Sequence, residues 1–222
     1  IGVSQVSNKG MSLKEPQVEC LKATFAMGCF WGSDVRFPSY NGVIRTRVGY
    51  CGGTKPNPTY YNLGDHTEAI DIDYDPKTIT FQHLLEVFWE HHDPTVQHKR
   101  QYMSAIFYHD DEQKRLAEDS MKEEQKKYSR PIVTQILKSG PFYEAEDYHQ
   151  KYHLRQYPAI FKSLNLEGKA LINSHVAAKL NAFLGGVVSV QQFEEQHKEL
   201  GLSEEQISAI RKLIEGGLPH HC

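Results

Sequence analysis

Apolar and polar side chains alternate along several short stretches of the chain, and such alternation is typical of β-strands with one buried face. Residues 43–50 and 67–74 alternate over their whole length, and Asp75-Pro76 ends the second stretch. Shorter apolar runs also predict strands, and these lie at residues 22–26, 104–108 and 132–137. The pattern therefore predicts a sheet built from the earlier part of the chain.

Helical spacing of apolar residues appears between these strands and then dominates. Residues 80–91 present one wide apolar face that includes Phe88 and Trp89, and Thr80 can cap this helix. Ser203 and Gln206 fit a capping box at the start of the last helix. The same spacing predicts further helices at residues 111–128, 142–152, 169–183 and 190–200.

Strands and helices are interspersed up to residue 157, and only helical patterns follow. This order predicts an α+β fold, an α/β two-layer sandwich with a mixed sheet, plus a helical C-terminal extension. We expect three parts: a flexible N-terminal segment (1–19), a sheet domain that carries the candidate chemistry (20–157), and the helical extension (158–222). The extension is expected to end in a mobile tail that carries Cys222.

The stretch Gly28-Cys29-Phe30-Trp31-Gly32 joins the first predicted strand to a segment that can start a helix. A cysteine at such a junction lies near free backbone N–H groups and the positive end of the helix dipole. Both favour the nucleophilic thiolate over the thiol. The aromatic pair Phe30-Trp31 follows at once and supplies an apolar wall. A lone cysteine among apolar residues is also commonly a small buried hydrophobe, so the local pattern leaves both interpretations open.

Composition narrows the classes of function. The chain has 222 residues, of which 39% are hydrophobic and 24% charged, with a formal net charge of −3, as in ordinary globular proteins. It shows no dense basic stripe for nucleic acid, no bilayer-spanning apolar run and no secretory or transit pattern. Its four cysteines form no C-x-x-C pair and no recognisable metal-ligand spacing. We expect a cytoplasmic monomer without a metal site.

Glu68 opens the alternating run 67–74, on the face that it shares with Ile70 and Ile72. A carboxyl group that faces inward is unusual, and burial would keep it protonated near neutral pH as a proton donor. An ion pair with Arg or Lys at the end of the sheet is an equally open alternative. Tyr60 and Tyr102 are further candidates, because a phenol donates a hydrogen bond while its ring supplies apolar wall. Ordinary packing is the commoner fate of any single tyrosine.

Several separated motifs resemble, in the same order, those of the type A peptide-methionine sulfoxide reductases, which act on the S epimer of methionine sulfoxide. The motifs are Gly-Cys-Phe-Trp-Gly at 28–32, Gly-Tyr-x-Gly-Gly at 49–53, Asn-Pro-Thr-Tyr at 57–60, Gly-x-His-x-Glu at 64–68, Gln-Tyr-x-Ser at 101–104 and an aromatic and acidic stretch at 142–152. The resemblance covers about residues 22–155. The helical extension is similar to that of a longer animal variety within the family.

The resemblance implies a role for each candidate residue. Cys29 attacks the sulfoxide sulfur, and Glu68 gives a proton to the sulfoxide oxygen, directly or through water. Tyr60 and Tyr102 hydrogen-bond that oxygen, and Phe30-Trp31 hold the substrate's methyl group. Methionine leaves, Cys29 becomes a sulfenic acid, and a second thiol condenses with it to a disulfide that thioredoxin reduces. The implied substrates are oxidised proteins and free methionine sulfoxide, with no metal or bound organic cofactor.

The chain departs from the family pattern near Tyr102 and at its end. The loop before the Gln-Tyr-x-Ser motif is shorter than in family members, so the loop's aspartate has no counterpart and its role is not assigned to Asp93. Met103 stands where the family has arginine, which is expected to alter substrate binding. The family's short tail with resolving cysteines is absent. Cys222 is therefore the first candidate for the resolving thiol and Cys20 the second, whereas the expected role of Cys51 is packing.

Two other functions would also use Cys29. A thiol peroxidase would reduce peroxide at this cysteine, but the aromatic pair beside it suits a methyl thioether better than a small polar oxidant. A sensor would bind oxidised methionine without turnover and recruit a partner through the helical extension. Rates with hydrogen peroxide and with methyl sulfoxides distinguish a peroxidase from a reductase. Binding that survives Cys29→Ser would favour the sensor.

Overall fold

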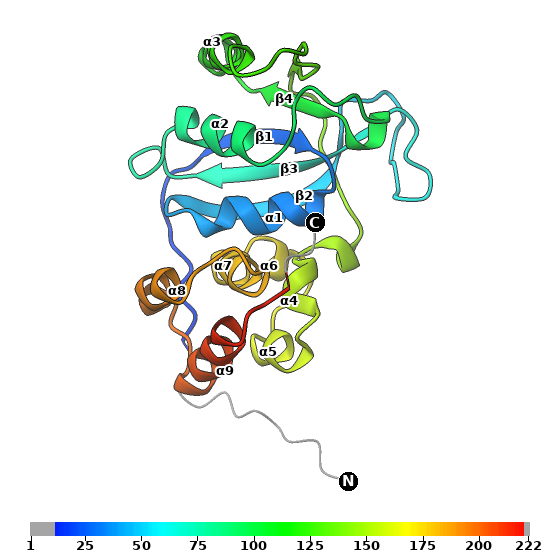
Figure 1. Cartoon of the computed structure of the whole chain (residues 1–222). Coiled ribbons are helices and arrows are strands. Elements are labelled where there is room, and N and C mark those ends of the chain that lie inside the picture. Colours follow the sequence, from blue (N-terminus) through cyan, green and yellow to red (C-terminus); the bar gives the residue numbers. More distant parts are fainter. Residues whose placement is uncertain (1–11, 220–222) are drawn as a thin grey trace.

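The computed structural model describes residues 12–219, which form a six-stranded sheet with helices packed on it and a C-terminal group of helices (Figure 1). The strand order is β5-β4-β1-β3-β2-β6, and all neighbours are antiparallel except the parallel pair β4 and β5. The strands are β1 (Leu21–Met27), β2 (Val43–Cys51), β3 (Thr67–Tyr74), β4 (Ser104–Tyr108), β5 (Gln135–Lys138) and β6 (Tyr143–Glu144). The predicted mixed sheet and α+β class are confirmed.

The main core lies between one face of the sheet and the helices that precede residue 126. Phe25 of β1, Ile70 of β3 and Phe88 of α2 are fully buried there, and each such side chain stabilises the fold by roughly 1.5–3 kcal/mol. Thr80 caps α2 as predicted, because its side chain accepts a hydrogen bond from the N–H of His83. The helices of this part are α1 (Phe30–Arg36), η1 (Phe37–Ser39), α2 (Phe81–Glu90), η2 (Arg100–Tyr102) and α3 (Asp111–Gln125).

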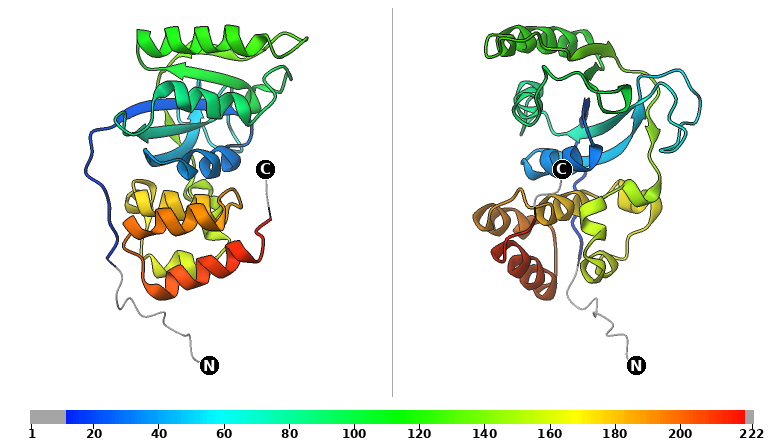
Figure 2. Two further views of the ribbon diagram at one scale, coloured as in Figure 1. Left: turned by 60° about the vertical axis from the view of Figure 1, so that its left-hand side comes forward. Right: turned by 45° about the vertical axis from the view of Figure 1, so that its right-hand side comes forward.

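The C-terminal helices have a second core of their own. Leu180, Phe183, Phe193 and Ile210 are completely buried in it. The predicted capping box at Ser203 is present in both directions. Figures 1 and 2 show α7 lying directly against α1, so that α1 is packed between the sheet and the C-terminal helices. These helices are α4 (Tyr152–Arg155), α5 (Pro158–Ser163), α6 (Gly168–Ile172), α7 (His175–Leu184), α8 (Val190–Gln196), η4 (His197–Glu199) and α9 (Glu204–Glu215).

The helix predicted over residues 142–152 is wrong. Tyr143 and Glu144 form β6 instead, because they pair with β2. A single 3-10 turn, η3 (Asp147–His149), follows. Lys151 then adopts a left-handed backbone conformation with φ of 54°, and α4 begins only after it. Hydrogen bonding to a sheet edge therefore overrides the local helical pattern.

Other predicted boundaries shift for local reasons. The single helix expected over 169–183 is two helices, because Ser174 caps α7 by accepting from the N–H of Ala177. The helix expected over 190–200 gives way to the 3-10 turn η4, and α3 ends at Gln125 rather than at residue 128. The strand expected from residue 132 begins at Gln135, where its pairing with β4 starts. No helix within residues 12–219 is long and apolar enough to cross a membrane.

Residues 12–20 form an extended segment that runs alongside the C-terminal helices before entering β1 (Figure 2). The backbone N–H groups of Ser12 and Lys14 donate to the carbonyls of Gly201 and Leu200, each at 3.0 Å. The start of the described chain is thus hydrogen-bonded to the C-terminal helical region. Residues 1–11 and 220–222, with Cys222, lie outside the described residues, and the predicted flexibility of these termini stays a prediction.

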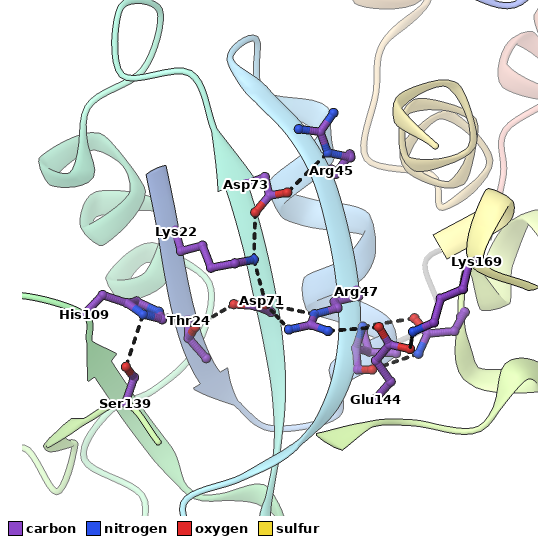
Figure 3. A network of polar contacts seen from close by, with 12 residues as sticks. Lys22, Thr24, Arg45, Arg47, Asp71, Asp73, His109, Ser139, Glu144 and Lys169 are labelled. Carbon is purple, nitrogen blue, oxygen red and sulfur yellow. Dashed lines mark hydrogen bonds and ion pairs between the residues drawn. The ribbon is translucent and has the colours of Figure 1, made fainter. Parts of the chain in front are cut away.

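A network of charged side chains crosses the sheet face opposite α2 (Figure 3). Asp71 alternates with the core residues of β3 and is 3% exposed. It accepts from Lys22 Nζ at 3.1 Å and from Arg47 Nε at 2.9 Å. Arg47 also donates to Glu144 of β6 at 2.9 Å, and Glu144 pairs with Lys169 of α6. The buried carboxylate is therefore satisfied, and β1, β2, β3 and β6 are tied to the C-terminal helices.

Candidate active site

Cys29 lies between β1 and α1, at the N-cap position of the helix. Gly28 before it has a φ of 93°, which glycine adopts without strain and which turns the chain sharply from strand to helix. The carbonyl of Cys29 accepts from the N–H of Gly32 at 3.2 Å. The residue itself is partly exposed. The predicted strand-to-helix junction is confirmed, and the positive end of the α1 dipole lies at this cysteine.

Glu68 comes from the start of β3 and is 1% exposed. One carboxylate oxygen accepts from the backbone N–H of Phe30 at 3.2 Å, and the other from Gln101 Nε2 at 2.7 Å. Burial raises the pKa of Glu68, and this rise outweighs the opposing effects of the two hydrogen bonds and of the charge on Lys99. Among residues 12–219 the alternative ion pair is not formed. The inward-facing carboxyl group predicted from alternation is present.

Tyr102 lies at the end of η2, immediately after Gln101. Burial raises the pKa of Tyr102, and its hydrogen bond with Tyr60 and the charges on Glu68 and Cys29 raise it further. A phenol with a raised pKa remains a hydrogen-bond donor in neutral solution. These mutual effects show that the fold brings the four predicted catalytic side chains into one place.

The indole of Trp31 is held on two sides. Its Nε1–H donates to His149 Nδ1 at 3.1 Å, and its ring stacks on Tyr152 with centroids 3.7 Å apart and an interplanar angle of 5°. Phe30 is 1% exposed and packs against Tyr50. The predicted aromatic wall therefore consists of a buried ring and a half-buried, fixed indole.

His149 belongs to the motif at 142–152 but lies outside the predicted set of catalytic and substrate-binding residues. It is 2% exposed, and its ring lies 5.0 Å from the ring centroids of Phe30 and of Tyr60. Burial lowers the pKa of His149, so the neutral imidazole is favoured. Because Nδ1 accepts from Trp31, the ring proton lies on Nε2. The motif at 142–152 contained this signal, but its periodicity indicated a helix.

Glu146 and Gln101 are two further residues that support the site. Glu146 accepts from the hydroxyl of Tyr50 at 3.1 Å and from the backbone N–H of Tyr60 at 3.2 Å. It therefore fixes the loop that carries Tyr60. Gln101 fixes the Glu68 carboxyl group in the same way. Neither role follows from apolar periodicity, since both depend on contacts between distant parts of the chain.

The other described cysteines lie away from this site. Cys51 is 3% exposed and burial raises its pKa to about 12, so packing is its role, as expected. Cys20 precedes β1 and Cys29 follows it. A strand rises about 3.3 Å per residue, so β1 separates them by roughly 20 Å, whereas a disulfide requires Cα atoms within about 7 Å. The fold therefore excludes a Cys20–Cys29 disulfide while β1 is intact.

A cavity of about 470 Å³ adjoins the aromatic wall. Trp31 and Tyr152 form one side, and Leu184 of α7 and Pro219, the last described residue, form another. The C-terminal end of the described chain therefore reaches the cavity beside Trp31. Cys222 itself lies outside the described residues, and so do all of its contacts.

The arrangement defines a class of enzyme. A thiol at a helix N-terminus, an acid with a raised pKa and two phenols suit attack on a neutral atom whose bound oxygen must be protonated to leave. Within residues 12–219, no group of three or more His, Cys, Asp or Glu side chains is placed to hold a metal ion. The thiol, the acid and the phenols together define the site of a cysteine-dependent oxidoreductase.

Comparison with known proteins identifies the family. Residues 21–179 match the model of the peptide methionine sulfoxide reductases, and residues 164–215 match that of the helical domain of selenoprotein methionine sulfoxide reductase A. The chain therefore belongs to the peptide methionine sulfoxide reductase family, and it is an oxidoreductase that reduces methionine sulfoxide. The resemblance deduced from the motifs is confirmed.

Individual relatives agree with this assignment. A peptide methionine sulfoxide reductase of Drosophila melanogaster is 48% identical over 187 residues, which are 83% of this chain and 76% of the relative. The crystal structure of reduced Mxr1 from Saccharomyces cerevisiae has a TM-score of 0.59 at 30% identity, covering 66% of this chain and 91% of that one. Methionine sulfoxide reductase A of Corynebacterium diphtheriae has a TM-score of 0.57 at 32% identity, covering 65% and 78%.

Proposed function

We propose that this protein reduces the S epimer of methionine sulfoxide, both free and in oxidised proteins, and so repairs oxidised proteins with electrons from thioredoxin. The observation that carries the proposal is the position of Glu68. Its carboxyl group is buried and accepts from the N–H of Phe30, the residue directly after Cys29. A proton donor is thereby held beside a nucleophile.

The reaction begins with attack of the Cys29 thiolate on the sulfoxide sulfur. The sulfoxide oxygen gains negative charge and leaves only when it is protonated. Glu68 supplies that proton because burial raises its pKa, and the hydroxyls of Tyr60 and Tyr102 donate hydrogen bonds to the oxygen. The net step transfers the oxygen from the methionine sulfur to the Cys29 sulfur. Methionine is released, and Cys29 becomes a sulfenic acid.

The choice of one epimer follows from where the site holds each substituent of the chiral sulfur. The aromatic pair Phe30-Trp31 binds the methyl group, with sulfur–aromatic contact worth about 0.3–1.5 kcal/mol. The phenols and Glu68 bind the oxygen. With both substituents fixed, only one configuration directs the sulfur at Cys29. The motif resemblance supports S as that configuration.

We propose Cys222 as the resolving thiol. Pro219 borders the same cavity as Trp31, and the three residues that follow can span about 10 Å at roughly 3.3–3.6 Å each. The Cys222 thiol condenses with the Cys29 sulfenic acid, forming a disulfide and water. Thioredoxin then reduces the disulfide through its own thiols. The cycle requires neither a bound metal nor an organic cofactor.

We further propose a cytoplasmic monomer. Thiol catalysis coupled to thioredoxin needs a reducing compartment, which supports the cytoplasm. Four large apolar side chains are exposed among the described residues: Val18, Leu21, Tyr61 and Tyr148. Four exposed side chains of this kind are few for the large apolar patch typical of obligate interfaces, which supports a monomer. We expect no nucleic-acid or membrane partner.

An epimer-specific assay tests the proposal. Each epimer of N-acetyl-methionine sulfoxide is supplied separately, and NADPH consumption is followed through thioredoxin and thioredoxin reductase. We expect turnover of the S epimer only. Turnover of the R epimer only, or of neither, would overturn the proposal. Parallel rates with hydrogen peroxide show whether the protein is a thiol peroxidase instead.

A further inference from the structure

One side chain of the C-terminal helices joins three helices around the candidate nucleophile. Asn181 of α7 is completely buried. Its Nδ2 donates to the backbone carbonyl of Asp34 in α1 at 3.0 Å, and its Oδ1 accepts from the backbone N–H of Leu154 in α4 at 2.9 Å. Both polar atoms of the Asn181 side chain are therefore hydrogen-bonded to backbone groups of neighbouring helices. Asn181 therefore fixes α1 relative to α4 and α7.

The residues that follow α1 are also held in place by the C-terminal helices. Lys179 of α7 is 4% exposed, and its ammonium group donates to the carbonyls of Pro38 and Tyr40 at 2.7 and 2.9 Å. Gln196 of α8 donates to the carbonyl of Ser39 at 3.0 Å. The last carbonyls of a helix lack partners within it, and a cation there also complements the helix dipole. These contacts therefore supply hydrogen-bond donors to the backbone carbonyls at the end of η1.

α1 has no room to shift between its neighbours. A Cβ atom on Gly185, at the end of α7, would lie 2.2 Å from Val35 Cγ1 of α1. On the sheet side, the Asp34 carboxylate accepts from the Thr46 hydroxyl of β2 at 2.7 Å. The helix is therefore fixed from both sides by close contact and by buried hydrogen bonds.

We propose that Asn181 is a positioning residue for Cys29, and that the helical extension serves as the support that holds the catalytic helix in place. Cys29 is the N-cap of α1, and the N–H of Phe30 in its first turn donates to Glu68. A tilt of α1 would displace the thiol, the dipole and this hydrogen bond together. The inference rests on the proposed role of Cys29, which it extends to a residue outside the site.

Alkylation of Cys29 by iodoacetamide at neutral pH tests the inference, with the modified peptide quantified by mass spectrometry. Asn181→Leu keeps the size of the side chain and removes both hydrogen bonds. Leu180→Ala is the matched control, because Leu180 is equally buried in the helical core. We expect Asn181→Leu to lower the alkylation rate by about two- to fivefold, the scale of a helix-dipole contribution. Its kcat should fall while the KM for free methionine sulfoxide stays unchanged.

The control should lose thermal stability but keep the wild-type alkylation rate. A wild-type rate in folded Asn181→Leu would overturn the inference, and so would an equal loss in both variants. If Asn181→Leu does not fold, Gln196→Ala replaces it, because Gln196 is only half-buried. Its alkylation rate should also fall, and a wild-type rate would again overturn the inference. Alkylation needs no substrate. A wild-type protein that fails to reduce methionine sulfoxide would therefore refute the proposed function without deciding this inference.

Discussion

The carboxyl group of Glu68 accepts a hydrogen bond at 3.2 Å from the backbone N–H of Phe30, the residue that follows Cys29. The acid is thereby attached to the first turn of the helix that Cys29 caps. A movement of that turn would displace both the proposed nucleophile and its proposed proton donor. The proposed chemistry therefore depends on the position of this first turn of α1 and on the contacts that fix it.

Replacing Glu68 with Gln keeps the shape of the side chain and removes its titratable proton. General acid catalysis contributes about 10²–10⁴-fold, so we expect the rate of methionine formation in a single turnover to fall by that range. Because the pKa of Glu68 is raised, the acid form declines as pH increases through that raised value. The wild-type rate should therefore fall toward alkaline pH, and the Glu68→Gln rate should not. If the Glu68→Gln rate shows the same decrease toward alkaline pH as the wild-type rate, this role is refuted.

The Trp31–His149 hydrogen bond predicts a second pH effect. A protonated imidazole cannot accept from the Trp31 N–H. The pKa of His149 is lowered from 6.5 by burial, so the folded protein keeps this bond until the pH falls through that lowered value. The stability of the protein should decrease as the pH falls from 6.5 toward the same value, because the unfolded state binds the proton more readily. The KM for methionine sulfoxide should rise once the imidazole of the folded protein is protonated.

His149→Leu tests this contact at constant pH. We expect the KM to rise by about two- to tenfold, corresponding to the net contribution of one hydrogen bond. His109→Leu is the control, because His109 contacts Thr24 and Ser139, outside the site. An equal rise in KM in both variants would mean that the effect of His149 is general rather than local.

How much of this site can be predicted from the sequence depends on how far apart in the sequence the contacting residues lie. Alternation along residues 67–74 sufficed to place Glu68 inward, because the period of a strand is local. The acceptor of the Trp31 indole, in contrast, lies 118 residues away in sequence at His149. Its segment was predicted to be a helix, and pairing of Tyr143 with Tyr50 across the sheet overrides that pattern. Long-range strand pairing leaves no signal in local periodicity.

The same distinction explains the cysteines. The sequence leaves Cys20 as a second resolving candidate, since only eight residues separate it from Cys29. Because the residues between them form an extended strand, the two cysteines are far apart in space. In the opposite sense, Pro219 is remote in sequence from Trp31 but lines the same cavity. The fold excludes the candidate that is near in sequence, and the resolving role of Cys222 stays a proposal.

Two matched substitutions test the resolving step. Cys222→Ser should still reduce one equivalent of methionine sulfoxide per enzyme but should cycle slowly with thioredoxin. Cys20→Ser should cycle like the wild type, because β1 keeps Cys20 away from Cys29. Peptide mapping of the oxidised wild type should show a Cys29–Cys222 link. A Cys29–Cys20 link would contradict the account, and the absence of any link would indicate direct reduction of the sulfenic acid.

The contact between α7 and α1 predicts a difference between two glycines that both end helices. A Cβ on Gly185 would lie 2.2 Å from Val35 Cγ1, whereas a Cβ on Gly216 has its nearest neighbour at 3.3 Å, the Lys212 carbonyl oxygen. Overpacking of this kind costs about 1–3 kcal/mol. We expect Gly185→Ala to lower the free energy of unfolding by that amount and Gly216→Ala to change it little. Similar values from urea denaturation would show that α7 is not tightly packed on α1.

The most direct test of the central claim is to follow the oxygen. Cys222→Ser protein is mixed with one equivalent of S-epimer methionine sulfoxide in the absence of reductant, and both the methionine formed and the mass of the Cys29 peptide are measured. The account predicts equal amounts of methionine and of Cys29 peptide carrying one added oxygen, trapped as a sulfenic acid. Methionine formation without modification of Cys29, or its persistence in the Cys29→Ser variant, would contradict it.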